Sequence, residues 1–236
     1  MLNILDFKNS KVYPFKGNPR TPVWQQLCDS LDKRTVEGLC LEFGVFKGLS
    51  INVMDKHDPT SIFWGFDSFE GLPENWVFNS RINIKKDKFD LKGEFPEVEP
   101  NVRLVKGWYN ESLPNWLDKR ILNCNFTDTS NSPTLMDLKV SFIHIDCDIY
   151  SSTKTIFDEL NPFIVGGTII VFDELCDWRL LDNPRVREHS HVVKKVYHNW
   201  KDHEWKALNE WVKKYNRSVV PVSRTYGTAC TIRVTN

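Results

Sequence analysis

The sequence lacks the features that mark nucleic-acid-binding and membrane proteins. Lysine and arginine together number 31, as do aspartate and glutamate, so the formal net charge is zero. A chain with no net positive charge lacks a general basic surface for nucleic acid or for an anionic membrane. No apolar run approaches the ~20 residues that a membrane-spanning helix needs. We therefore expect neither a nucleic-acid partner nor a membrane partner.

The sequence also lacks paired cysteines and a secretory leader. Its six cysteines are scattered, and no C-x-x-C motif occurs. Such usage is typical of reduced thiols and argues against both a disulfide framework and a zinc site. Residues 1–6 do not begin the basic and then long apolar pattern of a leader peptide. A cytoplasmic location is therefore expected.

A full G-x-G-x-x-G fingerprint is missing, although part of such a motif is present. Residues 38–41 form a short apolar run, and Gly44 and Gly48 follow it in a turn. Residues 51–57 are predicted to form a helix capped by Ser50. A strand, a glycine turn and a helix N-terminus together predict a nucleotide-type cofactor pocket at the carboxyl end of a parallel strand.

Acidic residues end the first two predicted strands. Glu42 closes the first strand, where a buried carboxylate needs hydrogen-bond donors or a cation. A cofactor that carries a cationic amine would supply both. Asp67 ends the strand predicted over residues 61–67, at about the separation from Glu42 that a βαβ unit requires. In dinucleotide-type folds such an acid accepts hydrogen bonds from the ribose hydroxyls, although Asp67 could instead cap the next turn.

Strands alternate with helices along most of the chain. Besides the two strands just described, strands are predicted over residues 102–108, 140–146, 168–174, 219–222 and 228–234. This alternation indicates a Rossmann-like, doubly wound α/β fold with a mostly parallel sheet of seven strands. The last two strands form an antiparallel C-terminal hairpin around Tyr226 and Gly227. We expect a single domain over residues 1–236.

Four segments lie outside this predicted sheet. Residues 1–37 are expected to form an irregular arm and then a helix that begins at Thr21 and Pro22. Residues 68–100 and 177–202 are expected to be insertions on the lid and acceptor side of the pocket. Residues 123–133, rich in Asn, Thr and Ser, are expected to form a loop.

Acids at the ends of several strands should meet at one edge of the sheet, because the carboxyl ends of parallel strands converge there. They are Glu42, Asp67, Asp146, Asp173 and Glu174. Such a group repels itself unless cations are present. Asp146, Asp173 and Glu174 offer the hard oxygen ligands that Mg²⁺ prefers. The open alternative is that Asp148 and Glu174 cap helices and that Asp146 orders its loop.

Five sequence blocks in this order resemble the macrocin O-methyltransferase (TylF/MycF/NovP-like) family of class I S-adenosylmethionine-dependent enzymes. The blocks are residues 41–48, 65–73, 106–109, 144–153 and 166–174. The resemblance implies an S-adenosylmethionine site made of Glu42, Gly44, Val45, Gly48, Asp67, Ser68, Gly107 and Trp108. It implies that Asp146 and Asp173 bind Mg²⁺, with Glu174 standing where many members have a second aspartate.

The expected function is O-methyl transfer from S-adenosylmethionine to a hydroxyl of a small metabolite, a sugar or glycoside, assisted by Mg²⁺. Asp146 and Asp173 are the expected catalytic residues, and a histidine of the 177–202 insertion is a further candidate base. His144 lies in mid-strand and is expected in the core. Two alternatives remain open: a nicotinamide-dependent oxidoreductase, and a non-catalytic cofactor-binding or assembly module. A homo-oligomer is also open.

Overall fold

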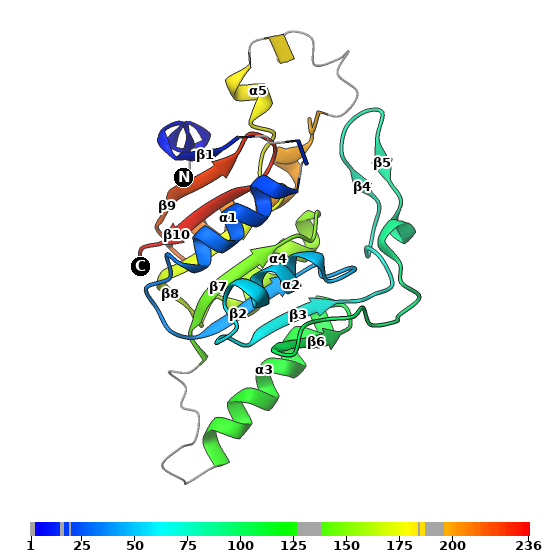
Figure 1. Ribbon diagram of the computed structural model, residues 1–236, viewed down its shortest axis with the longest axis vertical. Coiled ribbons are helices and arrows are strands. Elements are labelled where there is room, and N and C mark those ends of the chain that lie inside the picture. Colours follow the sequence, from blue (N-terminus) through cyan, green and yellow to red (C-terminus); the bar gives the residue numbers. More distant parts are fainter. Residues whose placement is uncertain (1–2, 15–16, 19, 127–137, 184, 187–195) are drawn as a thin grey trace.

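The computed structural model describes residues 3–14, 17–18, 20–126, 138–183, 185–186 and 196–236. Its centre is an eight-stranded sheet in the order β1-β9-β10-β8-β7-β2-β3-β6 (Figure 1). The strands are β1 (Lys11–Tyr13), β2 (Leu39–Phe43), β3 (Phe63–Asp67), β6 (Val102–Lys106), β7 (Val140–Ile145), β8 (Ile164–Phe172), β9 (Val219–Thr225) and β10 (Cys230–Val234).

The sheet confirms the predicted doubly wound α/β architecture. Strands β6, β3, β2, β7 and β8 run parallel to one another. Strand β10 runs antiparallel to both β8 and β9, which confirms the C-terminal hairpin. Every residue of β2 and β7 is buried. Helices cover both faces of a parallel sheet, so its central strands are apolar throughout rather than alternating.

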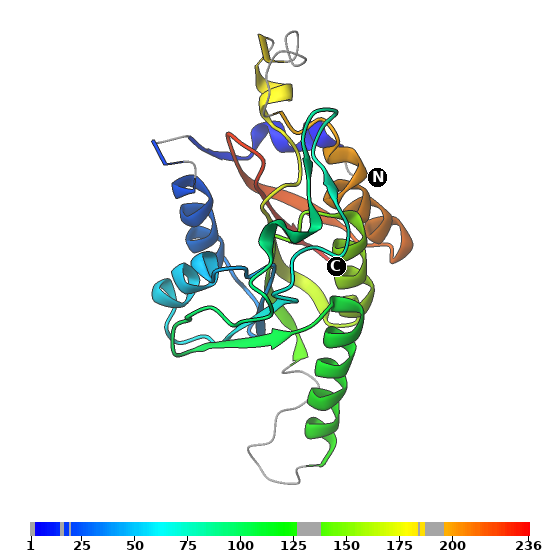
Figure 2. The same cartoon turned by 90° about the vertical axis from the view of Figure 1, so that its right-hand side faces the viewer.

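Helices form a layer on each side of the sheet. They are α1 (Thr21–Leu31), α2 (Leu49–His57), α3 (Tyr109–Phe126), α4 (Tyr150–Leu160) and α7 (Glu204–Lys214). Figure 2 shows α1 and α2 on one face and α3, α4 and α7 on the other. Within the described ranges, no helix combines the length and the apolar composition needed to cross a membrane.

Alternation along the strands divides the core into two clusters. Cys40 and Phe142 belong to the cluster that includes Leu27 of α1, whereas the next residues, Leu41 and Ile143, belong to the other. Successive side chains of a strand point to opposite faces, so each central strand contributes to both layers. The sheet is therefore held rigidly from both sides, which positions the loops at its carboxyl edge.

The sheet has one strand more than the seven predicted. The additional strand, β1, lies in the segment expected to be an irregular arm and pairs in parallel with β9. Only Tyr13 of its three residues is buried, while Lys11 and Val12 are exposed. Three residues with one buried side chain give no detectable alternation, which explains why the sequence did not reveal this strand.

The predicted cap of α2 was wrong. The helix begins at Leu49, and its N-cap is Gly48 with φ +74° and no side-chain hydrogen bond. This left-handed conformation suits glycine, which has no Cβ. Ser50 therefore lies inside the first turn rather than before it.

The two predicted insertions pack against each other. Residues 68–100 include β4 (Trp76–Val77) and β5 (Asn83–Ile84), which form a separate two-stranded sheet. The indole N–H of Trp76 donates to the hydroxyl of Tyr197 at 3.2 Å, and the Phe78 ring stacks on the Tyr197 ring at 4.6 Å. The side-chain amide of Asn79 donates to the carbonyl of Val196 at 2.8 Å.

The remaining described parts of the chain are short helices and the end of α3. Within residues 177–202 they are α5 (Arg179–Asp182) and η4 (Trp200–Asp202), and η1 (Ile4–Asn9) and η2 (Lys86–Phe89) lie elsewhere. Residues 123–126, expected in a loop, belong to α3. The rest of that predicted loop, and the histidines at 189 and 191, lie outside the described residues.

Replacing Trp178 by alanine should lower the free energy of unfolding by about 3–5 kcal/mol, as is usual for truncation of a buried tryptophan. Trp178 is 1% exposed, its indole N–H donates to the carbonyl of Ala229 at 3.0 Å, and its ring lies 5.2 Å from that of Phe7. Urea unfolding followed by circular dichroism measures the change. Ile62→Ala, at a 51% exposed position, should cost no more than about 0.5 kcal/mol. Equal costs for the two variants would contradict this assignment of the core.

Candidate functional site

A cavity of about 380 Å³ lies at the carboxyl ends of β2, β3, β7 and β8. The strand order reverses there, because β2 is flanked by β3 on one side and by β7 on the other, and such switch points are where α/β sheets bind ligands. The predicted site residues that line the cavity are Gly44, Val45, Asp67, Ser68, Trp108, Asp146 and Glu174. Glu42, Gly48, Gly107 and Asp173 are not among its lining residues.

The first glycine of the turn allows the ends of β2 and β7 to approach closely. Gly44 has φ +97°, and a Cβ at this position would lie 1.8 Å from the carbonyl oxygen of Asp146. No side chain fits into that gap. The amide of Asp146 donates to the carbonyl of Phe43 at 2.8 Å, which fixes the same approach from the other side.

The carboxylate of Asp67 is held by the glycine turn. Its Oδ2 accepts from the amides of Val45 and Phe46 at 2.9 and 2.7 Å, and its Oδ1 accepts from the amide of Phe69 at 2.8 Å. Burial raises the pKa of Asp67, while these N–H groups oppose that shift. A carboxylate has about four lone-pair sites, so it can still accept hydrogen bonds from ligand hydroxyls. Its orientation toward the cavity is therefore preset.

Glu42 lies under the cavity rather than in its wall. The side chain is fully buried, its Oε1 lies 2.8 Å from Nδ1 of His144, and its Oε2 has no hydrogen-bond partner in the structure. Burial lowers the pKa of His144, but the hydrogen bond and charge of Glu42 outweigh it, and the net shift is upward. His144 thus lies in the core as expected, and it provides a hydrogen-bond partner for Glu42 where the sequence analysis expected a cofactor amine. The cofactor role of Glu42 stays a prediction.

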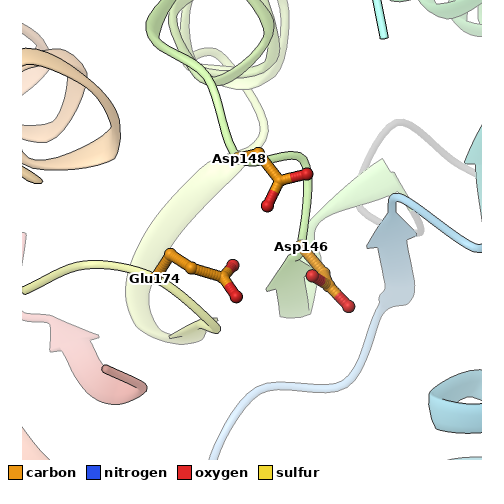
Figure 3. A group of neighbouring side chains, drawn as sticks. All are labelled: Asp146, Asp148 and Glu174. Atoms are coloured by element: carbon orange, nitrogen blue, oxygen red, sulfur yellow. The ribbon is translucent and has the colours of Figure 1, made fainter. Parts of the chain in front are cut away.

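Three acids that line the cavity lie close together (Figure 3). Asp146, Asp148 and Glu174 each place one carboxylate oxygen within 4.8 Å of the others. Asp146 follows β7, Asp148 precedes α4, and Glu174 follows β8. We call these three residues the acid cluster. Of the predicted metal ligands it contains Asp146 and Glu174, and it contains Asp148 where Asp173 was predicted.

Burial and mutual repulsion raise the pKa of every member of the acid cluster. Desolvation and the charge of Asp173 raise the pKa of Asp146 to about 7. Desolvation and the charges of Asp146 and Asp173 hold the pKa values of Asp148 and Glu174 well above their usual range. The cluster is therefore short of positive charge.

Asp173 lies beside the acid cluster and is paired with a residue that sequence reasoning missed. Its Oδ2 lies 3.3 Å from Nη1 of Arg20, a cation that precedes α1 and also lines the cavity. Its Oδ1 is buried, and no residue within the described ranges gives it a hydrogen bond. Nothing in the local pattern around Arg20 distinguishes it from other basic residues of the N-terminal arm. Only the fold, which joins residues 20 and 173, identifies it.

Asp148 belongs to the acid cluster although it was not among the predicted metal ligands. The alternative left open by the sequence was that Asp148 caps a helix. In the structure, α4 has Ile149 at its N-cap and no side-chain cap hydrogen bond. The backbone of Asp148 is left-handed, with φ +66°, which is uncommon for a residue with a Cβ and tends to occur at functional sites. The signal available in the sequence was the spacing Asp-x-Asp at the end of a buried strand.

The residues present fit a divalent cation. Three carboxylates offer hard oxygen ligands, and the cluster is short of positive charge. One oxygen of Glu174 and one of Asp173 are buried without hydrogen-bond partners. Mg²⁺ prefers a few carboxylates together with water or substrate oxygens. This donor set agrees with the magnesium prediction and does not test it.

Comparisons with known proteins support an O-methyltransferase resemblance. No family model matches the chain. The 8-demethyl-8-(2,3-dimethoxy-alpha-L-rhamnosyl)-tetracenomycin-C 4'-O-methyltransferase of Streptomyces olivaceus is 25% identical over 158 residues. The match covers 59% of this chain and 53% of the relative, so the chain spans about half the length of the curated relative that it matches.

Solved structures give the fold independently. The O-methyltransferase NovP is 16% identical with a TM-score of 0.51, over 94% of this chain and 85% of NovP. The calicheamicin methyltransferase CalS11 is 19% identical with a TM-score of 0.52, over 89% and 77%. Likeness at this level of identity shows a shared fold. Together with the curated relative, it confirms the predicted resemblance to O-methyltransferases.

The acid cluster should make the protein less stable as pH rises in the absence of divalent cations. The pKa of Asp146 is about 7 in the folded state, well above the ordinary value of 3.8 for an aspartate. The folded protein therefore binds this proton more tightly, and its stability falls as pH rises from about 4 toward 7. Thermal melts in EDTA between pH 5 and pH 7 should show a smaller loss for Asp146→Asn than for the parent protein. Parallel curves would argue against a buried, repelled Asp146.

Proposed function

We propose that this chain is an S-adenosylmethionine-dependent O-methyltransferase that acts on a hydroxyl of a small metabolite, a sugar or glycoside, with a divalent cation at the acid cluster. One observation carries the proposal: a single cavity is bordered by the glycine turn with its oriented Asp67 and by the acid cluster. The curated relative supports it, because its name describes 4'-O-methyl transfer on a rhamnosyl-tetracenomycin.

The glycine-turn side of the cavity would hold the cofactor. Asp67 is oriented to accept a hydrogen bond from a ribose hydroxyl, and the close approach at Gly44 leaves room for a ligand against the backbone. Trp108 lies on the wall beyond β6, where a base can stack on its ring. S-adenosylmethionine supplies an electrophilic methyl group on a positively charged sulfur. The neighbouring carboxylates favour that positive charge.

The acid-cluster side would bind and activate the acceptor hydroxyl. Asp146 and Asp148 line the cavity, and the raised pKa of each makes its carboxylate a stronger base than an exposed aspartate. In the absence of a bound cation, either can therefore accept the hydroxyl proton as the oxygen attacks. Asp146, Asp148 and Glu174 would hold Mg²⁺, which supplies Lewis-acid lowering of the hydroxyl pKa. Asp173, paired with Arg20, would add negative charge behind the cluster.

The rest of the cavity wall is mainly apolar and aromatic. Trp24, Trp76 and Phe89 line it, so an acceptor would be enclosed by rings from three separate segments. Apolar walls with a few directed polar groups are typical of small-molecule sites. A cytoplasmic setting is part of the proposal, and it is supported by the five free cysteines whose side chains the structure describes.

Titration calorimetry with S-adenosylmethionine should detect binding, and Asp67→Ala should weaken it about tenfold or more, because the charged acceptor of a ribose hydroxyl and the anchor of the glycine turn are lost. Asp146→Asn should leave the Kd within about threefold, since Asp146 lies on the acceptor side. Absence of binding heat in the parent protein would overturn the proposal. Thermal protection by NAD without protection by S-adenosylmethionine would favour the oxidoreductase alternative.

Methyl transfer should depend on the acids beyond the cofactor. We expect Asp146→Asn and Asp173→Ala to lower kcat by about a hundredfold or more, within the usual range for acid–base catalysis, while S-adenosylmethionine still binds. Mass spectrometry of a panel of sugars and glycosides measures the transferred methyl group. Asp158→Asn is the matched control, because Asp158 pairs with Lys214 of α7 and does not line the cavity. Cofactor binding without transfer to any acceptor would instead support the non-catalytic alternative.

A further inference from the structure

Arg20 is a cation placed against a group of buried acids. Its Nη1 lies 3.3 Å from Oδ2 of Asp173, and its side chain is 57% exposed while that of Asp173 is 7% exposed. Four nearby carboxylates raise the pKa of Arg20, because each stabilises its positive charge. They belong to Asp173, Asp146, Glu174 and Asp148. One exposed guanidinium therefore faces the charge of four carboxylates.

The pairing of Arg20 is loose compared with what its chemistry allows. A guanidinium can hold a carboxylate through two parallel hydrogen bonds, but the structure gives one contact to Asp173. The second oxygen of Asp173 is buried without a hydrogen-bond partner. Lys47 also lines the cavity, but its ammonium lies over the Phe46 ring at 5.4 Å from the ring centroid. Arg20 is thus the lining cation that the structure pairs with the acids.

We propose that Arg20 is a built-in counter-cation of the acid cluster that competes with a divalent metal ion for the same negative charge. The inference deepens the proposed function and rests on it, because it concerns how the metal enters that site. Two positive groups that share one set of carboxylates oppose each other's binding, and this opposition is reciprocal. Metal binding would therefore weaken the ion pair between Arg20 and Asp173.

This competition connects the metal to the N-terminal side of the cavity. Arg20 is the N-cap residue of α1, so its side chain joins the start of that helix to the end of β8. Once released from Asp173, the guanidinium still belongs to the cavity wall. Metal loading would then change the charge that the wall presents to an acceptor, without a change in the sheet.

The test is Mg²⁺ titration by calorimetry on the full chain, for the parent protein and for Arg20→Met and Arg20→Lys. Arg20→Met should bind Mg²⁺ about tenfold more tightly, because one repelling unit charge is removed and solvent screens most of the interaction of an exposed guanidinium with the metal ion. Arg20→Lys keeps the charge and should stay close to the parent value. Lys47→Met removes the other lining cation and should leave the affinity within about twofold.

A second readout is thermal stability without metal. Arg20→Met should melt at a lower temperature than the parent in EDTA, because the acids lose their counter-charge, and Mg²⁺ should raise its melting temperature by more than it raises that of the parent. A larger Mg²⁺ effect in the variant supports the proposal even if metal binding to the parent is too weak for calorimetry. Unchanged or weaker Mg²⁺ binding in Arg20→Met, including no binding in either protein, overturns it.

The same variants separate this inference from the proposed function. S-adenosylmethionine binding is measured on each protein, and Arg20→Met should retain it within about threefold because Asp67 and the glycine turn are untouched. Loss of cofactor binding in the parent would refute the methyltransferase proposal, whereas the metal titrations would still decide the competition between Arg20 and Mg²⁺.

Discussion

The close approach of two strand ends at Gly44 is the constraint on which the rest of the site depends. The backbone of β2 meets the carbonyl of Asp146 at a distance that excludes even a methyl group. That approach brings the glycine turn, which holds Asp67, next to the loop that carries Asp146 and Asp148. A ligand bound at the glycine turn is then within reach of the loop that carries Asp146 and Asp148. Burial of the central strands from both sides keeps this geometry rigid.

Charge is the second determinant of the site. The fold brings several carboxylates together at one edge of the sheet. Some of them have a hydrogen-bond donor or a cation beside them, and others do not. Glu42 obtains His144 from the neighbouring strand, Asp67 obtains three backbone N–H groups, and Asp173 obtains Arg20. The acid cluster has no comparable partner among the contacts that the structure describes. The protein thus keeps a group of carboxyls that ionise only at a cost to its own stability, at the place where binding of a cation would be most favourable.

The sequence predicted the sheet well because its strands are buried apolar runs that end in glycine or an acid. It also predicted that Asp67 and Asp146 would lie at one edge, since that follows from parallel topology. It could not separate Asp148 from Asp173 as the third member of the cluster, because backbone rotation after a strand decides which carboxylate turns inward. Arg20, β1 and the position of Glu42 beneath the cavity depend on contacts between residues distant in the chain, which local patterns do not encode.

The contact between the hairpin and Tyr197 has an evolutionary consequence. Trp76 lines the cavity, but its indole N–H is held by Tyr197, which does not line it. A substitution at Tyr197 would therefore shift Trp76 and reshape a cavity that Tyr197 itself does not line. Selection for a different acceptor could act at this buried position. Divergence among similar enzymes would then leave paired changes in two segments about 120 residues apart, rather than changes confined to residues that meet the ligand.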